Sequence, residues 1–222
     1  MLSLDNVQVS IEGVRVLRGV SCEIIEKKTT VLIGRNGAGK TTTLRAIMGL
    51  LKLDGGEIHL DADDLVRSPA HHRAFADIGY APEDRRLVAE LSVEDNIKLP
   101  ALALKLNKVE TKRRLDELYT LLPQLHVMRQ RPGGGVSGGQ GKMVALGRAL
   151  MIARKVLLLD EPFQGLAPAL ALDYARTLGE LRKHRPELAL LITESSPALL
   201  DKIADQTLQI ERGEIFTKPT ES

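Results

Sequence analysis

The sequence predicts an α/β protein whose core is a mainly parallel sheet, with an antiparallel β subdomain at the N-terminus and an inserted helical subdomain. Three observations support this prediction. A glycine-rich segment lies between an apolar strand and an amphipathic helix within residues 30–51. Apolar runs at 155–159 and 188–193 are typical of strands that are buried on both faces. Residues 84–154 contain helical patterns and interrupt the alternation of strands and helices.

Length and composition indicate one globular domain. The chain has 222 residues, 43% hydrophobic and 27% charged, which argues against disorder and against a membrane protein. No apolar run reaches the roughly 18–20 residues that cross a bilayer, and residues 1–10 alternate like a strand instead of forming a signal peptide. We expect one cytoplasmic domain, residues 1–222. Approximately residues 1–83 and 155–222 form the core with its antiparallel subdomain, and approximately 84–154 form the helical insert.

Charge and aromatic content argue against a nucleic-acid partner. The net charge is only +2, and the chain has three Phe, three Tyr and no Trp, so neither a basic stripe nor a base-stacking surface is indicated. The single cysteine, Cys22, can form no internal disulfide and has no metal-binding companion, so we interpret it as a core residue.

Local patterns predict the other elements. Residues 2–25 alternate in polarity and break at Glu12-Gly13, which predicts a β-hairpin. Capping and turn signals predict, in order, a turn at 55–56, a strand at 57–60, a solvated acidic loop at 61–64, a helical stretch from 71 that ends before 77, a strand at 78–81, helices at 92–105, about 115–122, 142–153, 168–183 and 196–204, and a hairpin over 207–216.

Residues 34–41 fit the phosphate-binding pattern G-x-x-x-x-G-K-[ST] without a mismatch. The glycines let successive backbone N–H groups turn toward one anion, and the helix that begins near Gly39 adds the positive end of its dipole. Lys40 supplies a mobile charge for the β- and γ-phosphates, and Thr41 offers a hydroxyl to Mg²⁺. We therefore predict a P-loop NTPase core. Its phosphate-binding residues are Gly34, Arg35, Asn36, Gly37, Ala38, Gly39, Lys40, Thr41 and Thr42.

Carboxylates stand where two predicted strands end. Asp160 and Glu161 follow the apolar run, and Glu83 follows the strand at 78–81. Open α/β sheets bind their ligands at such strand ends. Asp160 is suited to hold Mg²⁺ through its water shell, and Glu161 to orient or deprotonate the water that attacks the γ-phosphorus. The alternative for this pair is an ordinary surface turn after a strand.

Ser137-Gly138-Gly139-Gln140 precedes a predicted helix. Ser137 is a candidate N-cap, and the two glycines would let an anion approach bare backbone. Taken alone, the segment is equally typical of a helix that starts after a linker.

These three motifs, in this order and at this spacing, resemble those of the ATP-binding subunit of ABC transporters, and the resemblance covers essentially the whole chain. A finer similarity is to ATPases of branched-chain amino acid and urea importers, although ATPases for other cargoes, including those of lipopolysaccharide export, share much of the pattern. The finer similarity is in residues 34–44, 80–83, 147–151 and 161–168.

The resemblance implies a fold, cofactors and partners. ATP and Mg²⁺ would be bound, with Thr41, Glu83 and Asp160 on the metal side and Glu161 as the catalytic residue. ATP would lie between the cradle of one subunit and the Ser137–Gln140 segment of a second ATPase subunit, either another copy or a paralogue. Transmembrane permease subunits would dock near Glu83 on the cytoplasmic face of the inner membrane. A further partner would be a periplasmic or extracellular solute-binding protein.

Four positions depart from the wider family pattern. Val136 replaces the usual Leu before Ser137, which is a conservative apolar change. Ile11 stands where an aromatic residue usually stacks on adenine, so the base would be held less tightly. Glu83 replaces a glutamine, as it often does in the importer subgroup. Ser195 replaces a histidine that contacts the γ-phosphate, and it can donate one hydrogen bond but carries no charge. A register shift of one residue would place Glu194 there instead.

Three functions follow from these features. The first is an active ATPase that drives a membrane importer. The second, suggested by Ile11 and Ser195, is a nucleotide-responsive binding module with weak hydrolysis. The third is a soluble ABC ATPase that acts on nucleic acid or ribosomes, against which the weak basicity and the lack of an aromatic patch argue. An exporter of the lipopolysaccharide type is an alternative to the importer.

Overall fold

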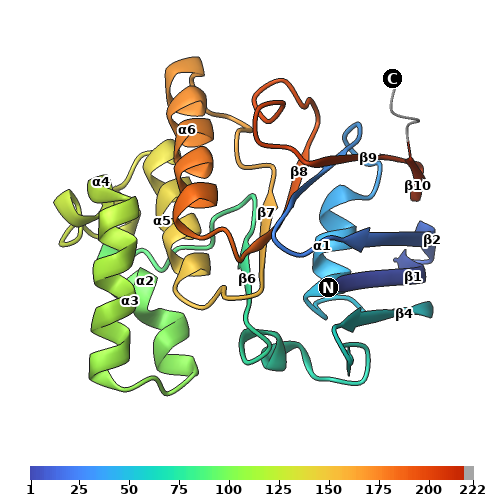
Figure 1. Cartoon of the computed structure of the whole chain (residues 1–222), viewed down its shortest axis with the longest axis horizontal. Helices are drawn as coiled ribbons and strands as arrows, with labels where there is room; N and C mark the ends of the chain where they lie inside the picture. The colour runs from blue at the N-terminus through green and yellow to red at the C-terminus, as the bar shows by residue number, and fades with distance from the viewer. Residues whose placement is uncertain (218–222) are drawn as a thin grey trace.

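A computed structural model describes residues 1–217, and it contains two sheets and two groups of helices (Figure 1). The larger sheet has six strands in the order β10-β9-β3-β8-β7-β6. Its strands β9, β3, β8, β7 and β6 run parallel, and β10 pairs antiparallel with β9. Their bounds are β3 (Thr29–Ile33), β6 (Ile78–Ala81), β7 (Val156–Asp160), β8 (Ala189–Glu194), β9 (Gln206–Glu211) and β10 (Glu214–Thr217). The predicted mainly parallel core is confirmed.

The antiparallel subdomain is also confirmed. Its four strands lie in the order β2-β1-β4-β5, and the first hairpin turns at Glu12-Gly13 as predicted. The bounds are β1 (Leu2–Ile11), β2 (Val14–Ile24), β4 (Gly55–Leu60) and β5 (Asp63–Asp64). This sheet packs over α1 (Lys40–Ile47) and the larger sheet, where its apolar residues share one core with strands β3, β7 and β8.

The helices between β6 and β7 form a separate layer at the side of the sheet (Figure 1). They are α2 (Val93–Ala103), α3 (Lys108–Leu121), α4 (Pro123–Val127) and α5 (Gly138–Leu150). Their apolar faces and that of α6 (Pro168–His184) meet the other side of the sheet in a second core. Ser92 caps α2 as predicted, by accepting a hydrogen bond from the Asp95 N–H at 3.0 Å. Short 3-10 helices lie at η1 (Ala70–Ala74) and η2 (Gly133–Gly135).

Three predicted elements differ from the structure. The acidic loop expected at 61–64 contains the two-residue strand β5, because the chain turns at Asp61, whose φ is +56°, and pairs back along β4. Gly55 and Gly56 belong to strand β4 and form no turn. Glycine is needed there because β1 approaches closely: a Cβ on Gly56 would lie 2.3 Å from the Asn6 carbonyl oxygen, and its φ is +88°. The helix expected at 196–204 is a loop of turns, in which a single α-type bond runs from the Ala204 N–H to the Leu200 carbonyl.

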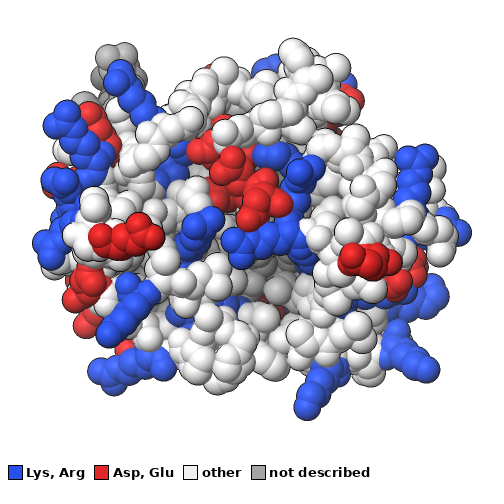
Figure 2. All heavy atoms as spheres, turned by 180° about the vertical axis from the view of Figure 1, so that it is seen from behind, with Lys and Arg blue, Asp and Glu red and all other residues white. Residues whose placement is uncertain are grey.

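The C-terminal hairpin turns at Arg212-Gly213 as predicted, with both residues at positive φ. Residues 218–222 lie outside the described part of the chain. Within residues 1–217, no helix has the length and apolar character needed to span a membrane. On the face seen in Figure 2, acidic side chains gather near a central hollow with basic side chains beside them.

Candidate active site

The glycine-rich segment forms a loop between β3 and α1. Gly37 and Gly39 have φ values of +80° and +114°, which L-residues rarely adopt, and Gly39 caps the helix. Gly34 is needed for a different reason, because a Cβ at this position would lie 2.5 Å from the Ile210 carbonyl oxygen. The loop therefore turns around glycines into the N-terminus of α1, where free backbone N–H groups and the helix dipole favour an anion.

Lys40 lies within this loop and is only 3% exposed. Its Nζ donates to the carbonyl oxygens of Gly34 at 2.7 Å and Arg35 at 3.2 Å. The same ammonium lies 3.0 Å from Oε1 of Glu161, which is itself 7% exposed. The cation that the motif provides for phosphate is therefore paired with a carboxylate at the end of β7.

Asp160 is the last residue of β7 and is 2% exposed. Its Oδ1 accepts from the hydroxyls of Thr41 at 3.0 Å and Thr193 at 2.9 Å, and its Oδ2 accepts from Tyr80 at 3.3 Å. Burial raises the pKa of this carboxyl, although the three hydroxyl donors oppose the shift. Asp160 and Thr41 thus lie together, as the predicted Mg²⁺ site requires.

Glu161 occupies a strained backbone position. Its φ is +42°, in the left-handed region that is unusual for a residue with a side chain. The turn is held because its N–H donates to the Thr193 carbonyl and hydroxyl, both at 3.1 Å, and because its carbonyl accepts from Lys142 Nζ. The buried Lys142 was not predicted from the sequence. Burial lowers the pKa of its ammonium group.

Ser195, and not Glu194, faces the cradle. The Ser195 hydroxyl donates to Asn36 Oδ1 at 3.2 Å and lies 3.5 Å from Lys40 Nζ. The buried Glu194 side chain turns away and accepts from the Phe163 N–H at 2.9 Å, while burial raises its pKa. The alternative register, with Glu194 at the cradle, is therefore wrong.

Glu83 lies two residues beyond β6 and reaches the same strand ends. Its partner is Gln164, a residue that no sequence motif singles out. With the amide nitrogen toward the two acids, Gln164 donates to Glu83 Oε1 at 2.8 Å and to Glu161 Oε2 at 2.5 Å. No motif indicates this contact, because it depends on two strand ends that the fold places side by side.

Two predicted site elements form no side-chain hydrogen bond with this cluster in the described chain. Ser137 caps α5 and forms a capping box with Gln140, with bonds of 3.3 Å and 3.0 Å, which confirms the predicted N-cap. Ser137 and Gly138 are exposed, and in the described chain no hydrogen bond joins residues 137–140 to the cradle. Ile11 ends β1 and is 37% exposed.

The donors at the strand ends suit a hard cation that arrives with a nucleotide. Over residues 1–217, no group of three or more His, Cys, Asp or Glu side chains could enclose a metal ion. Mg²⁺ commonly takes one or two carboxylates with substrate phosphates and waters. The Thr41 hydroxyl and the Asp160 carboxylate beside the phosphate loop offer such oxygen ligands.

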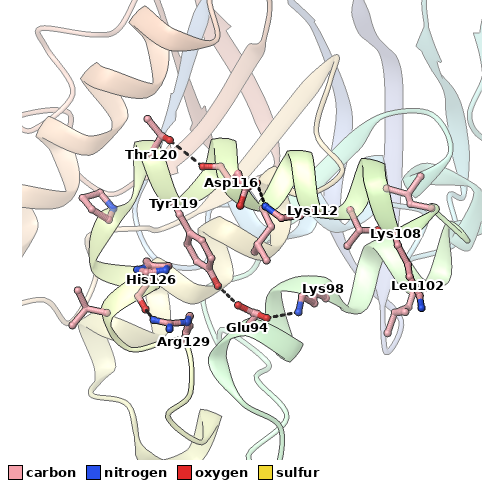
Figure 3. Close-up of a pocket in the computed structure, with 15 residues that line it drawn as sticks. Glu94, Lys98, Leu102, Lys108, Lys112, Asp116, Tyr119, Thr120, His126 and Arg129 are labelled. Carbon is pink, nitrogen blue, oxygen red and sulfur yellow. Dashed lines mark hydrogen bonds and ion pairs between the residues drawn. The ribbon is translucent and has the colours of Figure 1, made fainter.

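A second hollow, of about 910 Å³, lies among α2, α3 and α4, away from the strand ends (Figure 3). Two ion pairs lie in its wall. Glu94 binds Lys98 and also accepts a hydrogen bond from Tyr119 at 2.8 Å. Asp116 binds Lys112 in the same way. None of its lining residues belongs to the cradle or to the carboxylate cluster.

Comparisons with known proteins agree with this geometry. Residues 17–164 match a family model described as ABC transporter. BraG, a high-affinity branched-chain amino acid transport ATP-binding protein of Pseudomonas aeruginosa, is 33% identical over 99% of this chain and 93% of its own length. LptB, a lipopolysaccharide export system ATP-binding protein of Escherichia coli, is 32% identical over 99% and 90%.

A solved structure is similar in the same way. MJ1267, an ATP-binding cassette of an ABC transporter in its ADP conformation, superposes with a TM-score of 0.83 at 28% identity, over 97% of this chain and 89% of that one. The chain therefore belongs to the ABC transporter family, as an ATP-binding subunit in which ATP hydrolysis is coupled to transport.

Proposed function

We propose that this chain is the ATPase of a membrane importer for amino acids or related small polar solutes. The observation that supports hydrolysis most strongly is the meeting of Lys40, Thr41, Asp160 and Glu161 at one end of the parallel sheet. The similarity to BraG supports an amino-acid cargo. Glu83 agrees with it, because the importer subgroup that the sequence resembles often carries glutamate there.

Each side chain has a distinct part in the proposed reaction. The backbone N–H groups of residues 34–42 and Lys40 bind the β- and γ-phosphates. Thr41, Asp160 and Glu83 would hold Mg²⁺, which neutralises phosphate charge when it is bound. Glu161 accepts the proton of the attacking water as oxygen bonds to the γ-phosphorus and the bond to ADP breaks. Ser195 donates a hydrogen bond on the γ-phosphate side.

Nucleotide binding then rearranges the pair of Lys40 and Glu161. Lys40 and Glu161 form a 3.0 Å ion pair with each other. Phosphate oxygens would draw the ammonium away, because they accept several charge-assisted hydrogen bonds. The Glu161 carboxylate would then be free on its Oε1 side to receive a water. The exchange links occupancy of the cradle to activation of the base.

The Ser137–Gln140 segment completes the site of a second subunit in this proposal. Ser137 and Gly138 are exposed at the capped start of α5, and in the described chain no hydrogen bond joins the segment to the cradle. An anion such as a γ-phosphate held by another ATPase subunit, a copy or a paralogue, suits that end. Ile11 would lie on the adenine side. Permease subunits would contact the surface near Glu83 on the cytoplasmic face, and a solute-binding protein would deliver the cargo.

Uptake measurements test the proposed cargo. In cells that carry the gene, its deletion should abolish high-affinity uptake of labelled leucine or a related solute. Wild-type protein should restore uptake, and the Lys40→Ala variant should not, because it lacks the phosphate-binding cation. Normal uptake of amino acids and polar solutes in the deletion strain would contradict the importer.

An exporter of the lipopolysaccharide type is the second candidate, because LptB is similar to this chain over the same span as BraG. The deletion strain distinguishes the two. Loss of lipopolysaccharide from the cell surface with unchanged solute uptake would favour the exporter.

A further inference from the structure

Glu83 and Glu161 meet because their strands end at the same level. Ala81 of β6 pairs with Leu159 of β7, and each glutamate lies two residues beyond its paired residue. Two carboxylates that lie close together repel each other unless a donor or a cation lies between them. The side-chain amide of Gln164 fills that position, 2.8 Å from Glu83 Oε1 and 2.5 Å from Glu161 Oε2.

The chemistry of the three groups determines the orientation of the amide. A carboxylate oxygen only accepts hydrogen bonds at neutral pH, so the amide group that faces two carboxylates must be the NH₂, which has two N–H donors. The loop that carries Gln164 is held against the same turn, since its N–H donates to the Glu161 carbonyl at 3.2 Å. One amide therefore serves two carboxylates from neighbouring strand ends.

The two oxygens of Glu161 have different partners. Lys40 binds Oε1 and Gln164 binds Oε2. If phosphates withdraw Lys40, Gln164 is the remaining side-chain donor to this carboxylate among the described residues. The carboxylate would then be oriented by Gln164 at the moment when it has to accept a proton, and Gln164 is itself held to Glu83.

We propose that Gln164 is a positioning residue that ties the carboxylate of Glu161 to that of Glu83, so that the alignment of the water-activating group depends on the position of the loop after β6. This proposal rests on the proposed function, in which Glu161 accepts the proton and the surface near Glu83 contacts the permease. The hydrogen-bonded amide of Gln164 would thus link the water-activating carboxylate to the surface that contacts the permease.

The bridge itself can be detected without any turnover. In NMR spectra of the nucleotide-free full chain, the side-chain NH₂ signals of Gln164 are assigned by their loss in Gln164→Ala. We expect them to be displaced from the free-glutamine position, and to return toward it by more than half in Glu83→Ala. Signals at the free-glutamine position in the wild-type chain would overturn the proposal.

The functional consequence is tested by a double-mutant cycle on the chain reconstituted with its permease subunits. Gln164→Ala should lower kcat by roughly tenfold, the size expected for one hydrogen bond to a charged group, and leave KM for ATP within about twofold. In the Glu83→Ala background, the same substitution should change kcat by less than about threefold. Equal effects in both backgrounds would contradict the bridge.

Two more variants separate hydrogen bonding from packing. Gln164→Glu keeps the shape of the side chain but replaces the donor by a third carboxylate, so its kcat should fall at least as far as that of Gln164→Ala. Gln130→Ala, at an exposed glutamine outside the site, should match the wild type. Wild-type kcat in Gln164→Glu would overturn the proposal.

Failure of the inference differs from failure of the proposed function. If Glu161→Gln abolishes turnover while Gln164→Ala and Gln164→Glu retain it, the base is supported and the positioning residue is refuted. If Glu161→Gln retains turnover, the base assignment is wrong, whatever the NMR signals of Gln164 show.

Discussion

At the scale of single residues, the site consists of buried polar groups that bind one another. Lys40 is held by two carbonyl oxygens and Glu161, and Asp160 is held by three hydroxyls. The motif residues could be predicted from the sequence because the phosphate pattern specifies residue types at fixed spacing. Gln164 and Lys142 could not, since their partners are distant in sequence and meet only in the folded chain.

Removal of the cradle cation should weaken ATP binding. In Lys40→Ala, the phosphates lose the only mobile ammonium of the loop, and we expect the Kd for ATP to rise roughly 10- to 100-fold, the range for losing one or two charge-assisted hydrogen bonds. Calorimetric titration with ATP measures it. Lys112→Ala, at an exposed lysine on α3, is the matched control and should bind ATP like the wild type. Unchanged affinity in Lys40→Ala would refute the role of the cradle.

The buried Asp160 carboxylate should lower the free energy of unfolding at neutral pH, although ATP turnover needs it. Burial raises its pKa in the folded chain, so its contribution to the free energy of unfolding is greatest below the unfolded pKa of 3.8 and is lost as pH rises through the folded pKa. At pH 7, Asp160→Asn should therefore raise Tm by a few degrees while ATP turnover falls. The gain should disappear as the pH approaches 4. A Tm at pH 7 below that of the wild type would contradict this reasoning.

At the scale of elements, the predictions succeeded where apolar periodicity and the buried position agree. Strands β7 and β8 are entirely buried and were predicted from continuous apolar runs. The helix at 196–204 was predicted because Ser196-Pro197 is a strong helix-start signal. The prediction is wrong, since the segment forms only turns. The turn predicted at Gly55-Gly56 is wrong because glycine is favoured both in turns and where two strands approach closely.

The close approach at Gly56 makes a stability prediction. Gly56→Ala combines a Cβ contact of 2.3 Å with a φ of +88°, so β1 and β4 would have to separate. We expect a loss of about 2–4 kcal/mol in the free energy of unfolding by urea titration.

The matched control is Gly135→Ala, where an added Cβ meets no atom within 4 Å and the backbone φ is not positive. It should change the free energy of unfolding by less than about 0.5 kcal/mol. Equal stability of the two variants would show that β1 does not constrain position 56.

At the scale of the whole molecule, one chain carries two separate parts of the proposed chemistry. The cradle and the carboxylates meet at the sheet edge, whereas the Ser137–Gln140 helix end faces solvent without a partner from the cradle. The order of the motifs allowed the fold to be predicted over almost the whole chain. The second subunit could be inferred only from the family resemblance, because residue spacing does not reveal which chain a surface serves.

Association should therefore depend on nucleotide. A Glu161→Gln chain with ATP should sediment at about twice the 24.3 kDa of the monomer, and the additional change Ser137→Ala should return it to the monomer mass with ATP still bound. ATP-bound monomers of the Glu161→Gln chain at micromolar concentration would contradict pairing between two copies.

The most direct test of the account is phosphate release by Glu161→Gln, measured on the same sample as ATP binding. Turnover with the permease subunits should fall at least about 100-fold, because the water loses its proton acceptor, while ATP still binds. Turnover within twofold of the wild type, with ATP bound normally, would contradict the assignment of Glu161 and the mechanism derived from it.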